Sequence, residues 1–291
     1  VVTIEAAAAT GLAPGTPVVT GGADTQLALH GIAARPGTPT IVAGTFWQTT
    51  AVTDAPLIDP ERRLRTLCHV DPNAWMVEGI GFLSGLAMRW FRDAMCPDAS
   101  ASAAERGTSA FTVMEEWAST SPAGANGVVA TLANVMQADA WHQAAPSFLG
   151  FDINDPAAGS RGAFIRAIEE SAAIVAASHL EILTELTGGS ATANGTVTFT
   201  GGSSAGTLWP RIIAGVTGLD TAVTPAPEAT SYGAARLAAQ GVGASLPPMG
   251  EPDRIVHPDP TERAAYPEIA RRWHRVYRDV LSISGGELDP L

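Results

Sequence analysis

The chain has 291 residues, of which 46% are hydrophobic, so it can bury the cores of about two domains. Its formal net charge of −12 argues against a nucleic-acid partner, because clustered Lys and Arg supply the binding to phosphate backbones. The sequence contains no lysine, which excludes a P-loop, since that motif places a lysine on the nucleotide phosphates. A nucleotide site in this chain must therefore use backbone amides, hydroxyl groups and a metal ion.

Cysteine usage and hydropathy limit the compartment. Cys68 and Cys96 stand far apart without CxxC spacing, which predicts two reduced, buried cysteines and neither a disulfide framework nor a zinc site. No apolar run reaches the roughly 18 to 20 residues that span a bilayer, and the N-terminus lacks the residue order of a signal peptide. We therefore expect a cytoplasmic protein without a membrane partner. The chain begins at Val1, not at methionine, and we expect it to be a fragment.

The most informative segment is VVTGGADTQLALHG, residues 18–31. Its apolar start predicts a short strand over Pro17–Gly22, and the residues after the two glycines predict a helix. Between strand and helix stands one carboxylate, Asp24. This arrangement suits phosphoryl transfer to a hydroxyl, which needs a base for the hydroxyl proton and amides for the phosphoryl oxygens. The alternatives are ordinary turn chemistry and an Asp that caps its helix.

The middle of the chain predicts strands followed by helices. Thr40–Thr53 has the pattern of strand, turn and strand. Apolar residues at helical spacing predict a buried helix over Val77–Met95, and the Ala/Ser-rich stretch Asp98–Gly107 indicates a surface loop. A helix is expected at Ala110–Ala118. The longest helical pattern, Ser160–Leu186, predicts the central helix of a domain.

A second strand, glycine pair and helix follow in TVTFTGGSSAGTLWPRIIAG, residues 196–215. Two such corners allow two lobes to approach one nucleotide, with amides and helix N-termini on its phosphates. The last helical pattern covers residues 259–281. Its arginines and His274 predict a solvated face and not a nucleic-acid patch, given the acidic total.

These corners and four further segments resemble the FGGY carbohydrate kinases, which have an α/β, actin-like ATPase (ribonuclease H-like) fold. The segments GTFWQ (44–48), LAMRWFRDAMC (86–96), FIRAIEESAAIV (164–175) and HPDPTERAAYPEIARRWHRVYRDVL (257–281) are most similar to members that phosphorylate autoinducer-2. Glu228-Ala229-Thr230 and Gly233-Ala234-Ala235 are typical of the wider family. The resemblance covers nearly the whole chain but only the later part of such a kinase. It implies that residues 40–291 form the nucleotide-binding C-terminal domain with a closing C-terminal helix, and that residues 1–39 are a remnant of the N-terminal domain.

The resemblance also implies the site. Asp24 matches the catalytic base, and Thr25, Gln26 and Trp47 match substrate-binding positions, although Trp47 could equally fill the hinge between the lobes. The cofactors implied are ATP and magnesium, with no residue assigned to the metal. The nucleotide-binding positions implied are Gly44, Thr45, Gly85, Arg89, Gly201, Gly202, Ser203 and Gly206. Of these, Arg89 could instead be a paired surface charge.

The implied reaction is ATP-dependent phosphorylation of the terminal hydroxyl of linear autoinducer-2, 4,5-dihydroxy-2,3-pentanedione. The alternatives are a xylulokinase-like enzyme with a sugar or polyol substrate, and a non-catalytic remnant that binds nucleotide or a partner. The family's Asp-x-Gly-Thr turn is missing, and the loop GGSSAG lacks the third glycine and the lysine often found there. We therefore expect the chain alone to fold in its second domain, to leave Val1–Pro39 poorly supported, and to show no measurable kinase activity.

Overall fold

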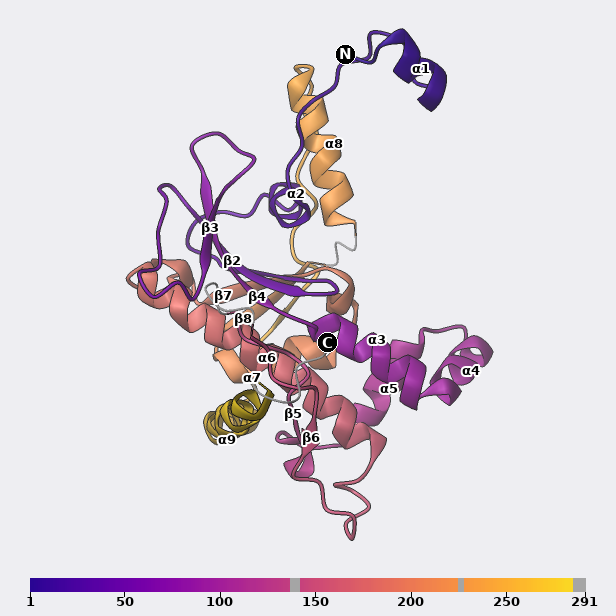
Figure 1. Cartoon of the computed structure of the whole chain (residues 1–291), viewed down its shortest axis with the longest axis vertical. Helices are drawn as coiled ribbons and strands as arrows, with labels where there is room; N and C mark the ends of the chain where they lie inside the picture. Colours follow the sequence, from indigo (N-terminus) through magenta and orange to yellow (C-terminus); the bar gives the residue numbers. More distant parts are fainter. Residues whose placement is uncertain (137–141, 225–227, 285–291) are drawn as a thin grey trace.

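The fold is a layered α/β arrangement in the computed structural model, which describes residues 1–136, 142–224 and 228–284 (Figure 1). In these residues seven strands form one sheet in the order β3-β4-β2-β1-β7-β8-β9, and two more form a small separate sheet. The strands are β1 (Thr40–Ala43), β2 (Trp47–Thr53), β3 (Arg65–Cys68), β4 (Trp75–Gly81), β5 (Val129–Ala130), β6 (Phe148–Leu149), β7 (Thr196–Thr200), β8 (Asp220–Thr224) and β9 (Arg254–Val256).

The centre of the large sheet is parallel and its edges are antiparallel. Strand β7 pairs in parallel with β1 on one side and with β8 on the other. Strands β2, β4 and β3 continue the sheet antiparallel beyond β1, and β9 closes it antiparallel beyond β8. Because β1, β7 and β8 are parallel, their carboxyl ends meet at one edge, which is where ligands bind in open α/β sheets.

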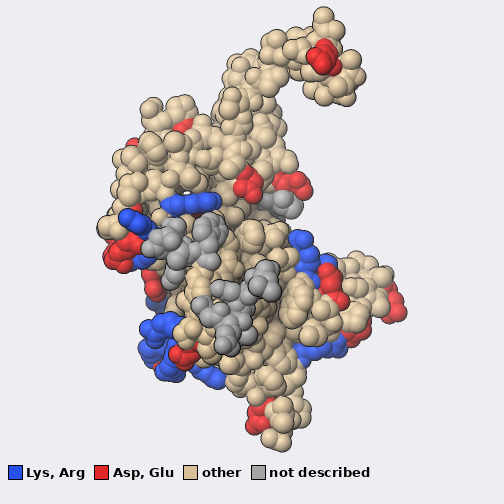
Figure 2. All heavy atoms as spheres, in the orientation of Figure 1, with Lys and Arg blue, Asp and Glu red and all other residues tan. Residues whose placement is uncertain are grey.

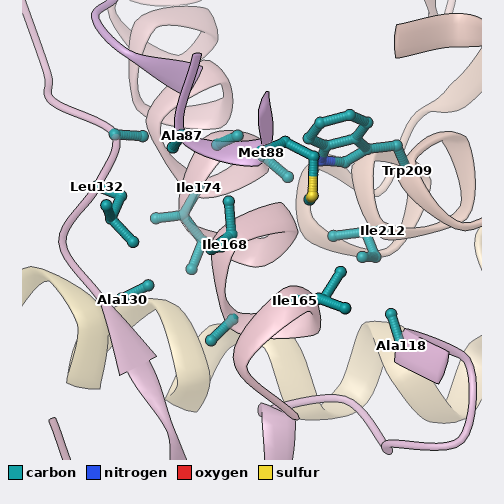
Figure 3. Close-up of a cluster of buried hydrophobic side chains, with 14 of the residues drawn as sticks. Ala87, Met88, Ala118, Ala130, Leu132, Ile165, Ile168, Ile174, Trp209 and Ile212 are labelled. Atoms are coloured by element: carbon teal, nitrogen blue, oxygen red, sulfur yellow. The ribbon is translucent and has the colours of Figure 1, made fainter. Parts of the chain in front are cut away.

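One long helix, α6 (Arg161–Leu186), crosses one face of this sheet and confirms the predicted central helix. It begins where the Ser160 hydroxyl accepts a hydrogen bond from the Ala163 amide at 3.2 Å. It is buried on almost all sides, because the sheet and other helices surround it. Figure 3 shows Ile165, Ile168 and Ile174 among side chains from those neighbours. The neighbours are α3 (Ser84–Met95), α5 (Ala110–Ala118), α7 (Leu208–Thr217) and α9 (Pro260–Ser284), and α4 (Pro97–Arg106) packs outside α3 and α5.

A buried ionic network ties α9 to α6. The Arg166 guanidinium is 1% exposed and donates to the carboxylates of Glu170 and Glu262, both at 3.0 Å, and to the Tyr266 hydroxyl at 3.0 Å. Burial raises the pKa of Tyr266, which keeps its hydroxyl protonated. Removing one member of such a network leaves a charge buried without compensation, at a cost of about 3–5 kcal/mol. The network therefore holds α9 against α6.

The outer face of α9 carries the arginines of the last helical pattern. Arg263, Arg271, Arg275 and Arg278 are exposed, and Figure 2 shows blue side chains gathered over this helix. His274 is half-buried, and its Nε2 lies 3.4 Å from the Ser178 hydroxyl. The arginines therefore form the solvated face that the sequence predicts, whereas His274 lies partly buried against α6. Among the helices of the described ranges, none is both long enough and apolar enough to cross a membrane.

On the other face of the sheet lies α2 (Asp24–Gly31), which packs against α8 (Ala229–Gly241). A Cβ atom on Gly233 would lie 1.8 Å from the carbonyl oxygen of Leu27, so the two helix backbones touch. The side chain of Leu29 packs on Val52 and Met76 of the sheet. The expectation that residues 1–39 are poorly supported is therefore wrong for α2. By contrast, α1 (Ile4–Thr10) buries no residue and lies away from the sheet (Figure 1).

Three predicted elements differ in the structure. Pro17–Gly22 is irregular and not a strand, because no strand in the described residues offers it hydrogen-bond partners. The helix predicted over Val77–Met95 begins only at Ser84, since residues 77–81 belong to β4. That strand is buried on both faces, which hides its alternation. The loop predicted over Asp98–Gly107 is helix α4, with proline at its first position and Gly107 after its end, a pair of signals typical of helix ends.

The cysteines are both free, as predicted, but only Cys96 is buried. Cys68 is exposed at the end of β3, near the edge of the sheet. An edge strand has one side without a neighbour, and this explains why the predicted burial fails there.

Glu169 on α6 provides a test of burial and pH. Its side chain is 4% exposed, its Oε2 atom has no hydrogen-bond partner among the described residues, and burial raises its pKa well above 4.5. When the pKa of a carboxyl group is higher in the folded than in the unfolded protein, the stability is fully present at pH values below the unfolded-state pKa. It is lost as the pH rises through the folded-state pKa. We expect Glu169→Gln to raise Tm by about 2 °C or more at pH 8 and by little at pH 4.5. Thermal unfolding at both pH values measures this, and an equal Tm difference at the two would contradict it.

Candidate functional site

A cleft of about 210 Å³ lies at the edge of the sheet where β1 and β7 end. This volume is smaller than the roughly 300–1,000 Å³ of most complete ligand pockets. Four segments far apart in the sequence meet there. The lining residues are Asp24, Thr25 and Ala28 of α2, Val42 of β1, Gly44, Thr45 and Phe46 of the following turn, Gln48 of β2, Gly201 and Gly202 after β7, and Ala229 and Thr230 of α8.

Asp24 is the carboxylate of this cleft. It is the first residue of α2 and is exposed, and its Oδ1 accepts a hydrogen bond from the Thr25 amide at 2.8 Å. The N-cap position belongs to Ala23, so Asp24 stands at position N1 and accepts from the amide of position N2, its neighbour Thr25. Its main-chain oxygen accepts from the Thr230 hydroxyl at 3.1 Å. Asp24 is thus oriented by its own helix and by α8, and its exposed side chain lines the cleft.

The two residues after Asp24 play different parts. Thr25 is 6% exposed and lines the cleft. Gln26 does not line it, because both ends of its amide are used by the protein. Its Oε1 accepts from the Ala23 amide at 2.7 Å, and its Nε2 donates to the carbonyl oxygen of Cys68 at 2.6 Å. Gln26 therefore holds the start of α2, and this geometry gives no support to its predicted contact with substrate.

Strand alternation separates Trp47 from the cleft. Trp47 is 1% exposed, and its ring centroid lies 5.3 Å from that of Phe199 and 5.0 Å from that of Trp209. Its neighbour Gln48 points to the opposite face of the sheet and lines the cleft. Trp47 is thus a core residue and does not wall this pocket. Because successive side chains of a strand point to opposite faces, the pattern of β2 could have predicted that Gln48, and not Trp47, faces the cleft.

The turn Gly44-Thr45 lies between β1 and β2 and is backed by the start of α3. The amides of Gly85 and Leu86 both donate to the carbonyl oxygen of Thr45 at 3.1 Å. A Cβ atom on Gly85 would lie 2.0 Å from the carbonyl oxygen of Gly44. Gly85 therefore supports the turn from behind and is not part of the cleft surface. Arg89, one turn further along α3, is exposed and also lies outside the cleft lining.

The second glycine pair lies at the end of β7. Gly201 has φ +99°, and a Cβ atom there would lie 2.6 Å from the carbonyl oxygen of Ala43, so this position requires glycine. A Cβ atom on Gly202 would meet open space, and Gly202 lines the cleft. Ser203 follows in a half-buried 3₁₀ turn, and Gly206 packs against the carboxylate of Glu115. The pair thus has one glycine that shapes the turn and one that opens it to a ligand.

Sequence reasoning missed Gln48 and Thr230 as cleft residues. Both lie in segments that it had already singled out, and Thr230 stands in the first turn of α8, the turn that borders the cleft. In the described residues, no three His, Cys, Asp or Glu side chains gather in a way that could hold a metal ion.

Comparison with known proteins finds relatives over nearly the whole chain. Residues 40–242 match the C-terminal domain of the FGGY family of carbohydrate kinases. An autoinducer-2 kinase from Salmonella paratyphi A is 39% identical over 284 residues, covering 95% of this chain and 53% of that protein. Another from Escherichia coli is 38% identical over 290 residues, covering 97% and 54%. The chain thus spans about half the length of the curated relatives it matches.

Solved structures share the fold. A xylulose kinase from Rhodospirillum rubrum superimposes with a TM-score of 0.74 at 26% identity, covering 97% of this chain and 55% of that chain. A gluconate kinase from Lactobacillus acidophilus reaches a TM-score of 0.76 at 17% identity, covering 97% and 56%. These likenesses confirm the predicted α/β, actin-like ATPase fold.

Proposed function

Because this chain belongs to the FGGY family of carbohydrate kinases, we propose that it carries the base and the adenosine-side glycine loop of an ATP-dependent kinase. The observation that carries this proposal is the single cleft in which Asp24, the turn Gly44-Thr45 and the open Gly202 meet. The proposed acceptor is the terminal hydroxyl of linear autoinducer-2, 4,5-dihydroxy-2,3-pentanedione. Higher identity to the autoinducer-2 kinases than to the xylulose kinase favours this acceptor.

The proposed reaction moves the γ-phosphoryl group of ATP to the acceptor oxygen. Asp24 accepts the hydroxyl proton while the oxygen forms its bond to the γ-phosphorus, and the bond from that phosphorus to the bridging oxygen breaks to release ADP. The Thr45 hydroxyl and the amides of its turn hold the phosphoryl oxygens. Gly202 lets the nucleotide approach the backbone closely. Mg²⁺, when bound, supplies positive charge that neutralises the phosphates.

The Gly202 position tests the nucleotide side of this proposal. We expect Gly202→Val to raise KM for ATP by about 10-fold, because its side chain would occupy open space that the nucleotide needs. KM for the acceptor is expected to stay within about twofold. The control is Gly250→Val, at another glycine without neighbours within 4 Å. Equal rises in both KM values would place Gly202 outside the nucleotide site.

The acceptor is tested by a substrate panel. The gene product that carries these residues is mixed with ATP, Mg²⁺ and either the dihydroxydione, xylulose or gluconate, and ADP release is followed. A preference for xylulose would replace the proposed acceptor by the xylulokinase-like alternative. Binding of ADP without turnover of any acceptor would favour a non-catalytic nucleotide-binding role. Because the reaction consumes ATP and acts on a small polar molecule, the compartment that we propose is the cytoplasm.

A further inference from the structure

The loop between β7 and α7 is held from outside by two side chains of opposite charge. On one side is Glu115 of α5, whose Oε1 accepts hydrogen bonds from the amides of Thr207, at 2.6 Å, and Leu208. On the other side is Arg254 of β9, whose Nη2 donates to the carbonyl oxygens of Ser204, at 3.0 Å, and Gly206. The carboxylate thus binds the donors of this segment and the guanidinium binds its acceptors.

The contact with Glu115 replaces a missing helix cap. Helix α7 begins after Thr207, whose own side chain makes no capping hydrogen bond. The first amides of a helix lack partners inside it, and they form its positive end. Glu115 supplies a charged acceptor for these amides from a helix far away in the sequence. A Cβ atom on Gly206 would lie 2.6 Å from the same Oε1, so the glycine is what lets the loop approach the carboxylate.

Neither charged side chain reaches the cleft. Both are half-buried and stand behind the loop, while Gly201 and Gly202 form its front, at the cleft. The loop also lacks side chains that would fix its shape from within, apart from Ser204, whose hydroxyl donates to the Gly201 carbonyl oxygen at 2.7 Å. The conformation that opens Gly202 to a ligand therefore depends on contacts from α5 and β9.

We infer that Glu115 and Arg254 are positioning residues for an adenine nucleotide, acting through the loop between them. This inference rests on the proposed function, since it takes Gly202 as part of the nucleotide site. Pre-forming the loop removes the entropic cost of ordering it when the nucleotide binds. Their effect thus falls on nucleotide affinity and not on the acceptor or on proton transfer at Asp24.

The test measures ADP binding to the 291-residue chain by calorimetry, which needs no turnover. We expect Glu115→Ala and Arg254→Met each to raise Kd for ADP by about 10-fold, because each removes hydrogen bonds to a charged group. Glu115→Gln and Arg254→Lys keep an acceptor and a donor, and they are expected to restore Kd to within about threefold.

Two matched controls separate this role from general stability. Glu116 follows Glu115 on α5 and pairs with Arg106 at the surface, so Glu116→Ala removes a carboxylate that does not touch the loop. Arg263 donates to the Gly218 carbonyl oxygen at 2.6 Å, at the other end of α7, so Arg263→Met removes a similar contact away from the loop. Both controls are expected to leave Kd for ADP unchanged.

Each outcome decides the inference. Weaker ADP binding in Glu115→Ala and Arg254→Met, with rescue by the conservative variants, supports it. Unchanged binding in these variants, when the unaltered chain binds ADP, overturns the inference and leaves the proposed function in place. Absence of ADP binding by the unaltered chain overturns the inference, whereas the proposed function is decided separately by the substrate panel on the gene product. Should Glu115→Ala fail to fold, Glu115→Asp provides the measurement, because it keeps the charge but moves it away from the loop; an unchanged Kd would then overturn the inference.

Discussion

Asp24→Asn is expected to lower kcat by about 10²- to 10⁴-fold and to leave KM for ATP within about twofold. The amide has nearly the same shape as the carboxylate but cannot accept the hydroxyl proton. The nucleotide contacts proposed here come from the glycine turns, which this change leaves intact. Steady-state kinetics of the gene product that carries these residues, with ATP and the acceptor varied in turn, gives both constants.

The control for this prediction is Glu228→Gln. Glu228 precedes the cleft residues Ala229 and Thr230 at the start of α8, so the variant removes one negative charge near the same cleft. It is expected to keep kcat within about threefold, because Glu228 is not among the residues that line the cleft. Near-normal kcat in Asp24→Asn would remove Asp24 from the chemistry and leave it as a residue of the helix start.

Gly233→Ala is expected to lower the free energy of unfolding by about 1–3 kcal/mol, the usual cost of overpacking. Two effects oppose each other at this position. Alanine in a helix gains roughly 0.8–1 kcal/mol over glycine. The new Cβ would, however, lie 1.8 Å from the backbone oxygen of Leu27, and backbone cannot turn aside as a flexible side chain can. The steric term therefore decides the sign, and denaturant unfolding followed by circular dichroism measures it.

Gly250→Ala is the matched control for Gly233→Ala, since a Cβ atom on Gly250 has no neighbour within 4 Å. Its stability is expected to stay within about 0.5 kcal/mol of the unaltered chain. A loss of kcat in Gly233→Ala beyond any loss of stability is also expected, because α8 holds the backbone of Asp24 through Thr230. Unchanged stability would mean that α2 and α8 can separate without cost.

Local patterns were sufficient where one segment carries its own signal. The apolar pattern of Ser160–Leu186 and the stripe of the last helix gave both long helices, since a buried helix face repeats every three to four residues. Asp24 could be singled out as a candidate site residue because it is the one carboxylate between the turn at Gly21-Gly22 and the helix that begins there. The motif segments indicated the FGGY family, and the match of residues 40–242 to its C-terminal domain confirms this.

Other assignments failed because they depend on partners distant in the chain. The strand predicted over Pro17–Gly22 is absent, since no described strand pairs with it. Whether Gln26 faces the cleft depends on the Cys68 carbonyl oxygen, 42 residues away, which holds its amide. The start of α3 was misplaced because β4 is covered on both faces, so its sequence shows no alternation.

The sequence by itself determined the fold class, the two long helices, the glycine corner between β7 and α7, and the carboxylate at the start of α2. The fold class follows from the resemblance of the motif segments to a known family, and the other features follow from residue spacing and from the conformations that glycine and proline allow locally. Only the tertiary structure decided that Gln48 and Thr230 face the cleft, that Trp47 belongs to the core, and that Glu115 and Arg254 hold the loop behind Gly202. Each of these depends on which strands and helices pack together, and long-range packing has no periodic signature within a single segment.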